Sequence, residues 1–133
     1  MARQDNVSSY TVRQAELTQM TSTPTKAYLS QGYFIKLLLS AKQMMLSGLL
    51  NKPEQQNRID KIEREIVYLK AQYEKIKNQI QSCQCSPNGR NILEWHYLDG
   101  LTMSAISKRL NERTQYLNVI HKEALAAFEN MIT

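Results

Sequence analysis

The sequence predicts an all-α protein, in which an N-terminal antiparallel helical hairpin resembling a coiled coil is followed by a C-terminal helix-turn-helix module. Apolar residues recur at spacings of three and four along most of the chain, as they do on one face of a helix. Only four glycines and three prolines interrupt the 133 residues, whose hydrophobic and charged shares of 42% and 22% are typical of globular proteins. The helix-breaking residues gather at a few points and divide the chain into helices.

Net charge and hydropathy restrict the class of protein further. The formal net charge is +5, which permits nucleic-acid binding without requiring it. No run of 18 apolar residues occurs, because Lys36 and Lys42 interrupt the most apolar segment. The first twenty residues also lack the apolar core of a signal peptide. We expect a protein of the bacterial host cytoplasm with no membrane segment.

The residues that commonly carry chemistry form no recognisable set. Cys83 and Cys85 are separated by one residue, which strains a mutual disulfide. With His96 and His121 they match no strong metal-ligand spacing. No nucleophile and base stand at an interpretable spacing, and no glycine-rich phosphate loop is present. We therefore expect no enzyme activity, no cofactor and no metal.

Two segments precede the hairpin turn. Residues 1–23 contain eleven Ser, Thr, Asn or Gln residues and no sustained apolar period, which predicts a flexible polar arm. Thr23 and Pro24 suit the start of a helix, and Asn51-Lys52-Pro53 suits its end. Between them we expect one broad apolar stripe at helical spacing, formed by Tyr28, Phe34, Leu37, Leu38, Ala41, Met44, Met45 and Leu49.

The second helix of the hairpin, from Pro53 to about Ser82, carries a coiled-coil seam with gaps that alternate between three and four. The seam residues are Ile59, Ile62, Ile66, Leu69, Tyr73, Ile76 and Ile80. The short connection favours packing against the first helix rather than a parallel two-chain coiled coil. Leu38, Leu39, Met45 and Val67 do not all fit one narrow seam. We therefore predict oligomerisation through the seam residues together with Leu37, Leu38 and Met45, with a dimer favoured, or a docking partner.

The C-terminal module follows a linker at residues 83–88 and occupies residues 89–133. Apolar residues from Ile92 to Leu98 predict a short helix that Asp99-Gly100 ends. A helix from about Met103 to Leu110, a turn at Asn111-Glu112 and a last helix from about Thr114 to Ile132 follow. Asn111 can adopt the left-handed backbone of a tight turn, whereas Glu112 stands where this motif usually buries Val or Ile. Thr114 is a candidate cap for the last helix.

About 40 residues of this module resemble region 4 of bacterial sigma factors, and in particular phage transcriptional regulators of the ArpU or RinA type. The residues that carry the resemblance are Arg90-Asn91-Ile92-Leu93, Tyr97-Leu98-Asp99-Gly100, Leu101-Thr102, Ile106-Ser107, Leu110, Ile120 and Ala124-Leu125. The resemblance implies a sequence-specific DNA-binding phage or prophage regulator. It would act as an activator on double-stranded DNA together with host RNA polymerase.

The resemblance also implies which residues contact DNA. The residues expected to contact bases are Thr114, Gln115, Asn118 and Lys122. The residues expected to contact phosphates are Arg90, Lys108, Arg109 and Arg113. Residues 86–133 hold five basic and five acidic residues, so the module is neutral and should bind DNA weakly alone. Two copies joined by the hairpin, or contact with polymerase, would supply the missing affinity.

Two other functions remain open from the sequence. Small terminase subunits, which recognise DNA for packaging, also combine a helix-turn-helix with a helical oligomerisation hairpin. A phage protein that binds and modulates a host protein would use the apolar flank of the hairpin instead of the helix-turn-helix. A small terminase subunit would form a ring of large mass, which distinguishes it from a dimeric regulator. A complete lack of DNA binding would indicate the protein that binds a host protein.

Overall fold

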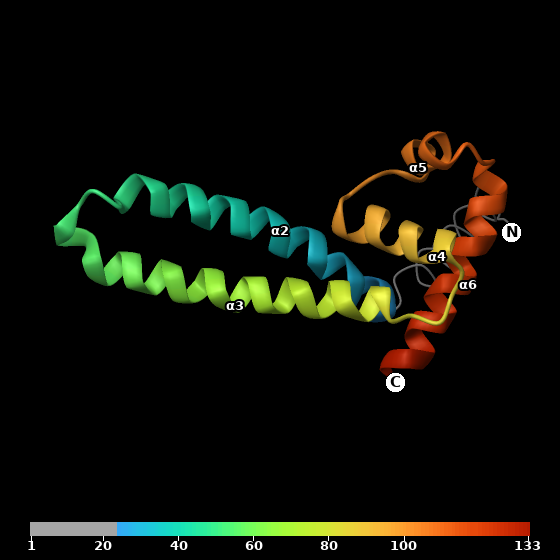
Figure 1. The fold of residues 1–133 in the computed structure, drawn as a ribbon, viewed down its shortest axis with the longest axis horizontal. Helices are drawn as coiled ribbons and strands as arrows, with labels where there is room; N and C mark the ends of the chain where they lie inside the picture. Colours follow the sequence, from blue (N-terminus) through green and yellow to red (C-terminus); the bar gives the residue numbers. More distant parts are fainter. Residues whose placement is uncertain (1–23) are drawn as a thin grey trace, which may run out of the picture.

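The computed structural model describes residues 24–133, and 85% of them are helical, with no strand among them (Figure 1). The all-α prediction is therefore confirmed for this part of the chain, while the predicted polar arm at residues 1–23 lies outside it. The described α-helices are α2 (Pro24–Leu49), α3 (Gln56–Gln81), α4 (Pro87–Ile92), α5 (Met103–Leu110) and α6 (Thr114–Ile132). None of these helices is both long and apolar enough to cross a membrane.

Helices α2 and α3 lie side by side and run in opposite directions (Figure 1). A short connection and a 3-10 turn, η1 (Pro53–Gln55), join them, with the Lys52 N–H donating to the Leu49 carbonyl at 3.0 Å. Near this connection Leu49 of α2 packs against Ile59, Ile62 and Ile66 of α3. This apolar cluster holds the far ends of the two long helices together.

The seven seam residues of α3 pack against other helices of the same chain. The five isoleucines of the seam are buried against neighbouring helices, and Leu69 and Tyr73 are half-buried. These side chains are therefore not available to a second molecule. The seam residues predicted for oligomerisation thus pack within one chain, where α2 and the C-terminal helices cover them.

The buried face of α2 also differs from the predicted stripe. Thr25, Leu29, Gly32 and Leu49 are the buried residues of this helix. Phe34, Leu37, Leu38, Met44 and Met45, which were expected in the stripe, are instead exposed. The actual seam includes a threonine, a glycine and the half-buried Lys42, whose ammonium group pairs with Glu65 at 3.0 Å. The spacing of apolar residues does not detect a buried threonine, glycine or lysine. It therefore indicates the more apolar face of α2 instead.

The largest core cluster joins the α2–α3 pair to the C-terminal helices. It brings Leu29 of α2 and Ile80 of α3 together with Leu98 and Phe128, all of them fully buried. Leu98 belongs to a π-helical turn, η2 (Leu93–Leu98), which approaches α2 so closely that a β-carbon at Gly32 would overlap the Leu98 side chain. The predicted boundary at residues 83–88 therefore separates two segments that share one core.

The linker itself is shorter than predicted, because Pro87 begins α4 and Asn88 is helical. Ser86 caps this helix by accepting a hydrogen bond from the Gly89 N–H at 3.0 Å. A third apolar cluster then forms between α4, α5 and α6 from Ile92, Ile106, Leu117 and Ile120. This cluster fixes the position of α5 relative to the first half of α6.

Candidate nucleic-acid interface

The turn between α5 and α6 is only three residues long and has a defined backbone. Asn111 adopts the left-handed conformation, with φ 56° and ψ 47°, as the sequence predicted. The Glu112 N–H donates to the Ser107 carbonyl at 3.1 Å, so the last turn of α5 is closed by a bond typical of a helix C-terminus. The Ser107 hydroxyl donates to the Glu112 carbonyl, and the Glu112 side chain is exposed. The structure thus accommodates a carboxylate at this position by turning it toward solvent.

The start of α6 is not capped by Thr114. Arg113 occupies the N-cap position, with φ −71° and ψ 143°, and makes no side-chain capping bond. Its guanidinium group only donates hydrogen bonds, so it cannot accept one from the first N–H groups of the helix. The prediction that Thr114 takes over this role is wrong, because Thr114 is already the first helical residue.

The first half of α6 presents two distinct faces. Leu117 and Ile120 are buried against α4 and α5. All four predicted base-contact residues, Thr114, Gln115, Asn118 and Lys122, are exposed on the remaining surface of the helix. Tyr116 and Val119 are also exposed, by 49% and 55%, so two large apolar side chains stand among the polar ones.

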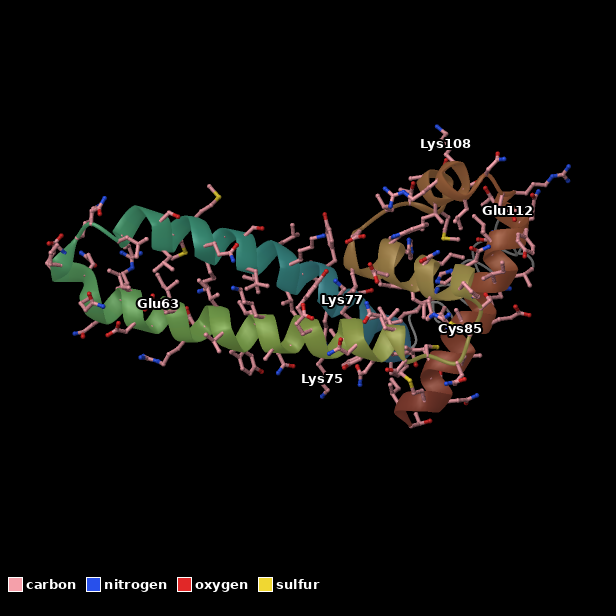
Figure 2. The ribbon with its side chains drawn as sticks, in the orientation of Figure 1. Glu63, Lys75, Lys77, Cys85, Lys108 and Glu112 are labelled. Atoms are coloured by element: carbon pink, nitrogen blue, oxygen red, sulfur yellow. The ribbon has the colours of Figure 1, made fainter. Side chains whose placement is uncertain are left out.

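Three of the four predicted phosphate-contact residues surround this surface. Lys108 and Arg113 are exposed, and Lys108 projects away from the molecule from α5 (Figure 2). Arg109 lies over the Trp95 ring, with its guanidinium carbon 4.8 Å from the ring centroid. Such stacking orients the guanidinium group while its N–H groups remain directed along the plane.

Arg90 has a different role. Its Nη1 donates to the carbonyl oxygens of Cys83 and Cys85, at 3.2 and 2.8 Å, and the residue is half-buried. These bonds satisfy carbonyl groups in the segment that follows α3. Arg90 therefore stabilises the linker, and it is not one of the phosphate contacts that we propose.

A half-buried aromatic cluster supports the inner side of α6. Tyr97 Oη lies 2.8 Å from His121 Nε2, and His96 Nδ1 lies 2.7 Å from the Leu101 carbonyl oxygen. Burial, with smaller contributions from His96 and Lys26, lowers the pKa of His121 to about 4. Burial also raises the pKa of Tyr97. Near neutral pH both groups are uncharged, and the tautomer of His121 decides which of them donates the hydrogen bond.

The lowered pKa of His121 predicts a pH-dependent stability. In the unfolded chain this histidine binds a proton near its ordinary pKa of 6.5, whereas in the folded chain its pKa is about 4. The stability from the neutral histidine is therefore complete above about pH 6.5 and declines as pH falls from there toward 4. Urea unfolding at pH 7.5 and pH 5 should show this loss, and His121→Gln should reduce the difference. An equal loss in the variant would contradict the assignment.

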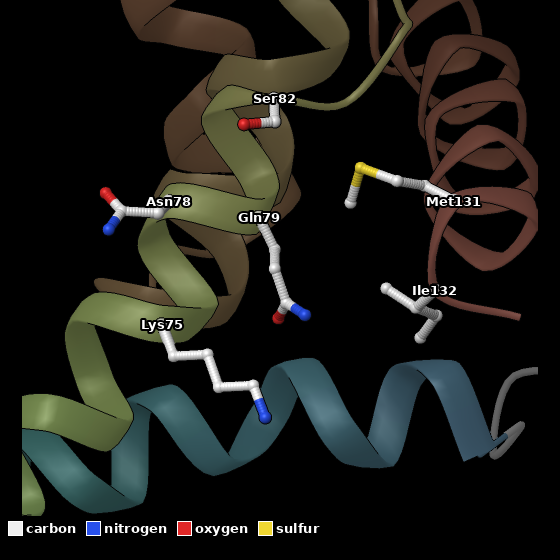
Figure 3. A pocket seen from close by; sticks show the side chains of 6 residues that line it. All are labelled: Lys75, Asn78, Gln79, Ser82, Met131 and Ile132. Atoms are coloured by element: carbon white, nitrogen blue, oxygen red, sulfur yellow. The ribbon is translucent and has the colours of Figure 1, made fainter.

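Residues 24–133 also contain an open hollow and two cysteines. An open hollow of about 530 Å³ lies between α3 and the end of α6 (Figure 3). It is lined by Lys75, Asn78, Gln79, Ser82, Met131 and Ile132, which include no carboxylate, histidine or thiol. Within residues 24–133 no three His, Cys, Asp or Glu side chains gather in a way that could hold a metal ion. Cys83 and Cys85 are both free thiols.

Comparisons with known proteins add no relative. No family model matches this chain, and no curated protein or solved structure matches it significantly. A function must therefore be inferred from the surface of α5 and α6 itself, and the resemblance to sigma region 4 stays a prediction.

Proposed function

We propose that the chain is a sequence-specific DNA-binding protein in which α5, the turn and α6 form a helix-turn-helix, carried by the α2–α3 hairpin. The observation that carries this proposal is the two-faced first half of α6. Its apolar side is fixed by a buried cluster, and its polar side is exposed directly after the left-handed turn at Asn111. A recognition helix must offer such a surface to enter the major groove of DNA.

The chemistry of this surface favours direct contact with bases. The amide groups of Gln115 and Asn118 can each bond the N6 and N7 atoms of adenine, and they lie three residues apart on one side of the helix. Thr114 lies one turn before Asn118 and Lys122 lies one turn after it, so both extend the polar surface. Tyr116 and Val119 suit apolar contact with thymine methyl groups. An A·T-containing target is therefore expected.

Phosphate contacts would fix the position of α6 in the groove. Lys108, Arg109 and Arg113 precede α6 in the chain and lie on α5 and in the turn. Contacts of this kind supply affinity that is independent of base sequence and sensitive to salt. Because the C-terminal module is neutral overall, one copy would bind weakly, and two linked copies would bind much more tightly.

The biological role we propose is transcription regulation next to host RNA polymerase. It is supported by the resemblance of residues 90–125 to sigma region 4, which in sigma factors contacts both promoter DNA and polymerase. In this role it would act beside a complete sigma factor rather than replace it.

The experiment that tests this proposal is footprinting of the purified chain on fragments of its own genome, followed by titration of the protected site. A Gln115→Ala, Asn118→Ala double variant should lose at least about 30-fold in affinity for that site, because each of the two bidentate amide contacts contributes about 1–3 kcal/mol of base discrimination. Its weak binding to unrelated DNA at low salt should not change.

A Gln81→Ala, Asn130→Ala double variant is the matched control. Both residues are exposed amides, one at the end of α3 and the other near the end of α6. This variant should bind like the unaltered chain. Unchanged sequence preference in the first variant would refute the role of α6 as the reading helix. A chain that binds no DNA at any salt concentration would refute the proposed function.

A further inference from the structure

The outward surface of α2 carries an apolar stripe that no other part of residues 24–133 covers. We call it the outer α2 stripe, and it consists of Phe34, Leu37, Leu38, Ala41, Met44, Met45 and Gly48. Its five large side chains are exposed by 65%, 50%, 48%, 77% and 41% in chain order. Ala41 and Gly48 are exposed as well. Contiguous apolar surface of this kind is typical of an interaction site.

The stripe carries no charge of its own. From residue 34 to the end of α2 the only charged residues are Lys36 and Lys42. Lys36 pairs with Asp99 at 2.9 Å and Lys42 pairs with Glu65 at 3.0 Å, so both ammonium groups are directed to other elements of the same chain. A surface that covers this stripe must therefore be apolar and uncharged, because it would otherwise bury an unpaired charge.

The residues of the stripe are arranged symmetrically about Ala41. Leu37 and Met45 lie four residues from it, and Leu38 and Met44 lie three residues from it, in opposite directions along the helix. Two copies of α2 packed antiparallel, with a two-fold axis at Ala41, would place each leucine opposite a methionine of the other copy. A two-fold interface uses the same patch on both molecules, so the patch must complement itself in this way.

Gly48 gives the second, independent observation. It lies near the end of α2, where a glycine lowers helix stability compared with alanine. A β-carbon at this position would meet no atom within 4 Å, so the packing of the single chain gives no reason for a glycine. Phe34 and Gly48 both lie seven residues from Ala41. In the antiparallel pair, the large ring of one copy would therefore lie over the glycine of the other.

We propose that the outer α2 stripe is the interface of a homodimer, in which two α2 helices pack antiparallel about Ala41 and Phe34 of each copy fits over Gly48 of its partner. The exposed parts of the five large side chains amount to roughly 500 Å² per copy, so the pair would bury on the order of 1,000 Å², the lower bound for a specific interface. This inference names the interface of the proposed regulator, but its test requires no DNA.

The test is the mass of the full chain in solution, measured by sedimentation between about 1 and 100 μM. We expect twice the single-chain mass of 15.4 kDa. Met44→Glu should weaken the dimer roughly 10- to 100-fold, because it buries a charge at the interface. The matched control is Val67→Glu on the outward side of α3, where the side chain is exposed by 68%, and its mass should not change.

A size exchange tests the antiparallel register. Gly48→Phe should weaken the dimer at least 10-fold without unfolding the chain, since the space at Gly48 is open in the single chain. The double variant Phe34→Ala, Gly48→Phe keeps one large and one small residue at each contact and should restore the dimer. Circular dichroism verifies that each variant is folded.

Three results would overturn the proposal. A single-chain mass over the whole range would assign the stripe to a different partner. A larger ring would require a heterologous interface. A dimer that Met44→Glu leaves intact, or that the double variant does not restore, would exclude this contact between Phe34 and Gly48. Each of these results is independent of whether the chain binds DNA.

Discussion

Replacing Phe128 by alanine should lower the free energy of unfolding by about 3–5 kcal/mol, the cost of removing a large aromatic side chain from a packed core. Phe128 is fully buried in the cluster that contains Leu29, Ile80 and Leu98. Its ring centroid lies 6.3 Å from that of Tyr28, so it connects the last helix of the chain to the first described one. Such a loss is a large part of the total stability of a small protein.

The same substitution tests whether the chain unfolds as one unit. Far-ultraviolet circular dichroism reports mainly on α2 and α3, whereas the fluorescence of Trp95, the single tryptophan, reports on the third apolar cluster. Because Phe128 belongs to the shared core, both signals should move to lower urea concentration together, at a fixed protein concentration. Tyr116→Ala changes an aromatic residue of the same helix that is 49% exposed, and it should move neither signal appreciably.

Two well-separated transitions in the unaltered chain would contradict the shared core. They would mean that residues 24–82 and residues 89–133 fold as separate domains, as the sequence predicted. A shift of the fluorescence transition alone in the Phe128 variant would lead to the same conclusion.

Sequence patterns predicted the helices well where apolar residues were regular. The seam of α3 alternates in threes and fours, and Ile59, Ile66 and Ile80 are buried accordingly. The buried positions of α6, from Leu117 to Phe128, also recur at spacings of three and four. In both helices the buried face is more apolar than the rest of the helix, so the spacing of apolar residues alone identifies it.

The same reasoning failed for α2, because this helix has two faces that favour burial. One face packs inside the chain and includes Thr25 and Gly32, which allow close approach of neighbouring elements. The other face is more apolar and is the outer α2 stripe. A sequence pattern shows that a face is apolar, but it does not show whether the same chain or a second molecule covers it.

Long-range packing explains the other differences. Leu29 and Phe128 are almost a hundred residues apart, and no local pattern indicates that they meet in one core. The type of Arg90 suggested a phosphate contact, but its position after the linker directs it to the carbonyl groups of Cys83 and Cys85. The left-handed Asn111 was predictable, because a tight turn needs a residue that tolerates this backbone.

Reversing two charges beside α6 should nearly abolish DNA binding. A Lys108→Glu, Arg113→Glu variant removes two proposed phosphate contacts and changes the net charge of residues 86–133 from zero to −4. Each lost contact should reduce the magnitude of the slope of log K against log salt concentration by about 0.9. The new carboxylates also repel the phosphates of the DNA backbone. We expect a loss of roughly 100- to 1,000-fold in affinity for specific and unrelated DNA alike.

The matched control for this variant is Lys70→Glu, Lys75→Glu on α3, which makes the same change in total charge. Both lysines are exposed, and Lys75 and Lys108 project from different parts of the molecule (Figure 2). If the local surface of α5 and α6 binds DNA, the control should lose much less affinity and keep the salt dependence of the unaltered chain. An equal loss in both variants would mean that the +5 charge, which resides in residues 24–85, binds DNA non-specifically. In that case α6 would not be the recognition helix, because the cations of α5 and the turn would contribute no more than those of the hairpin.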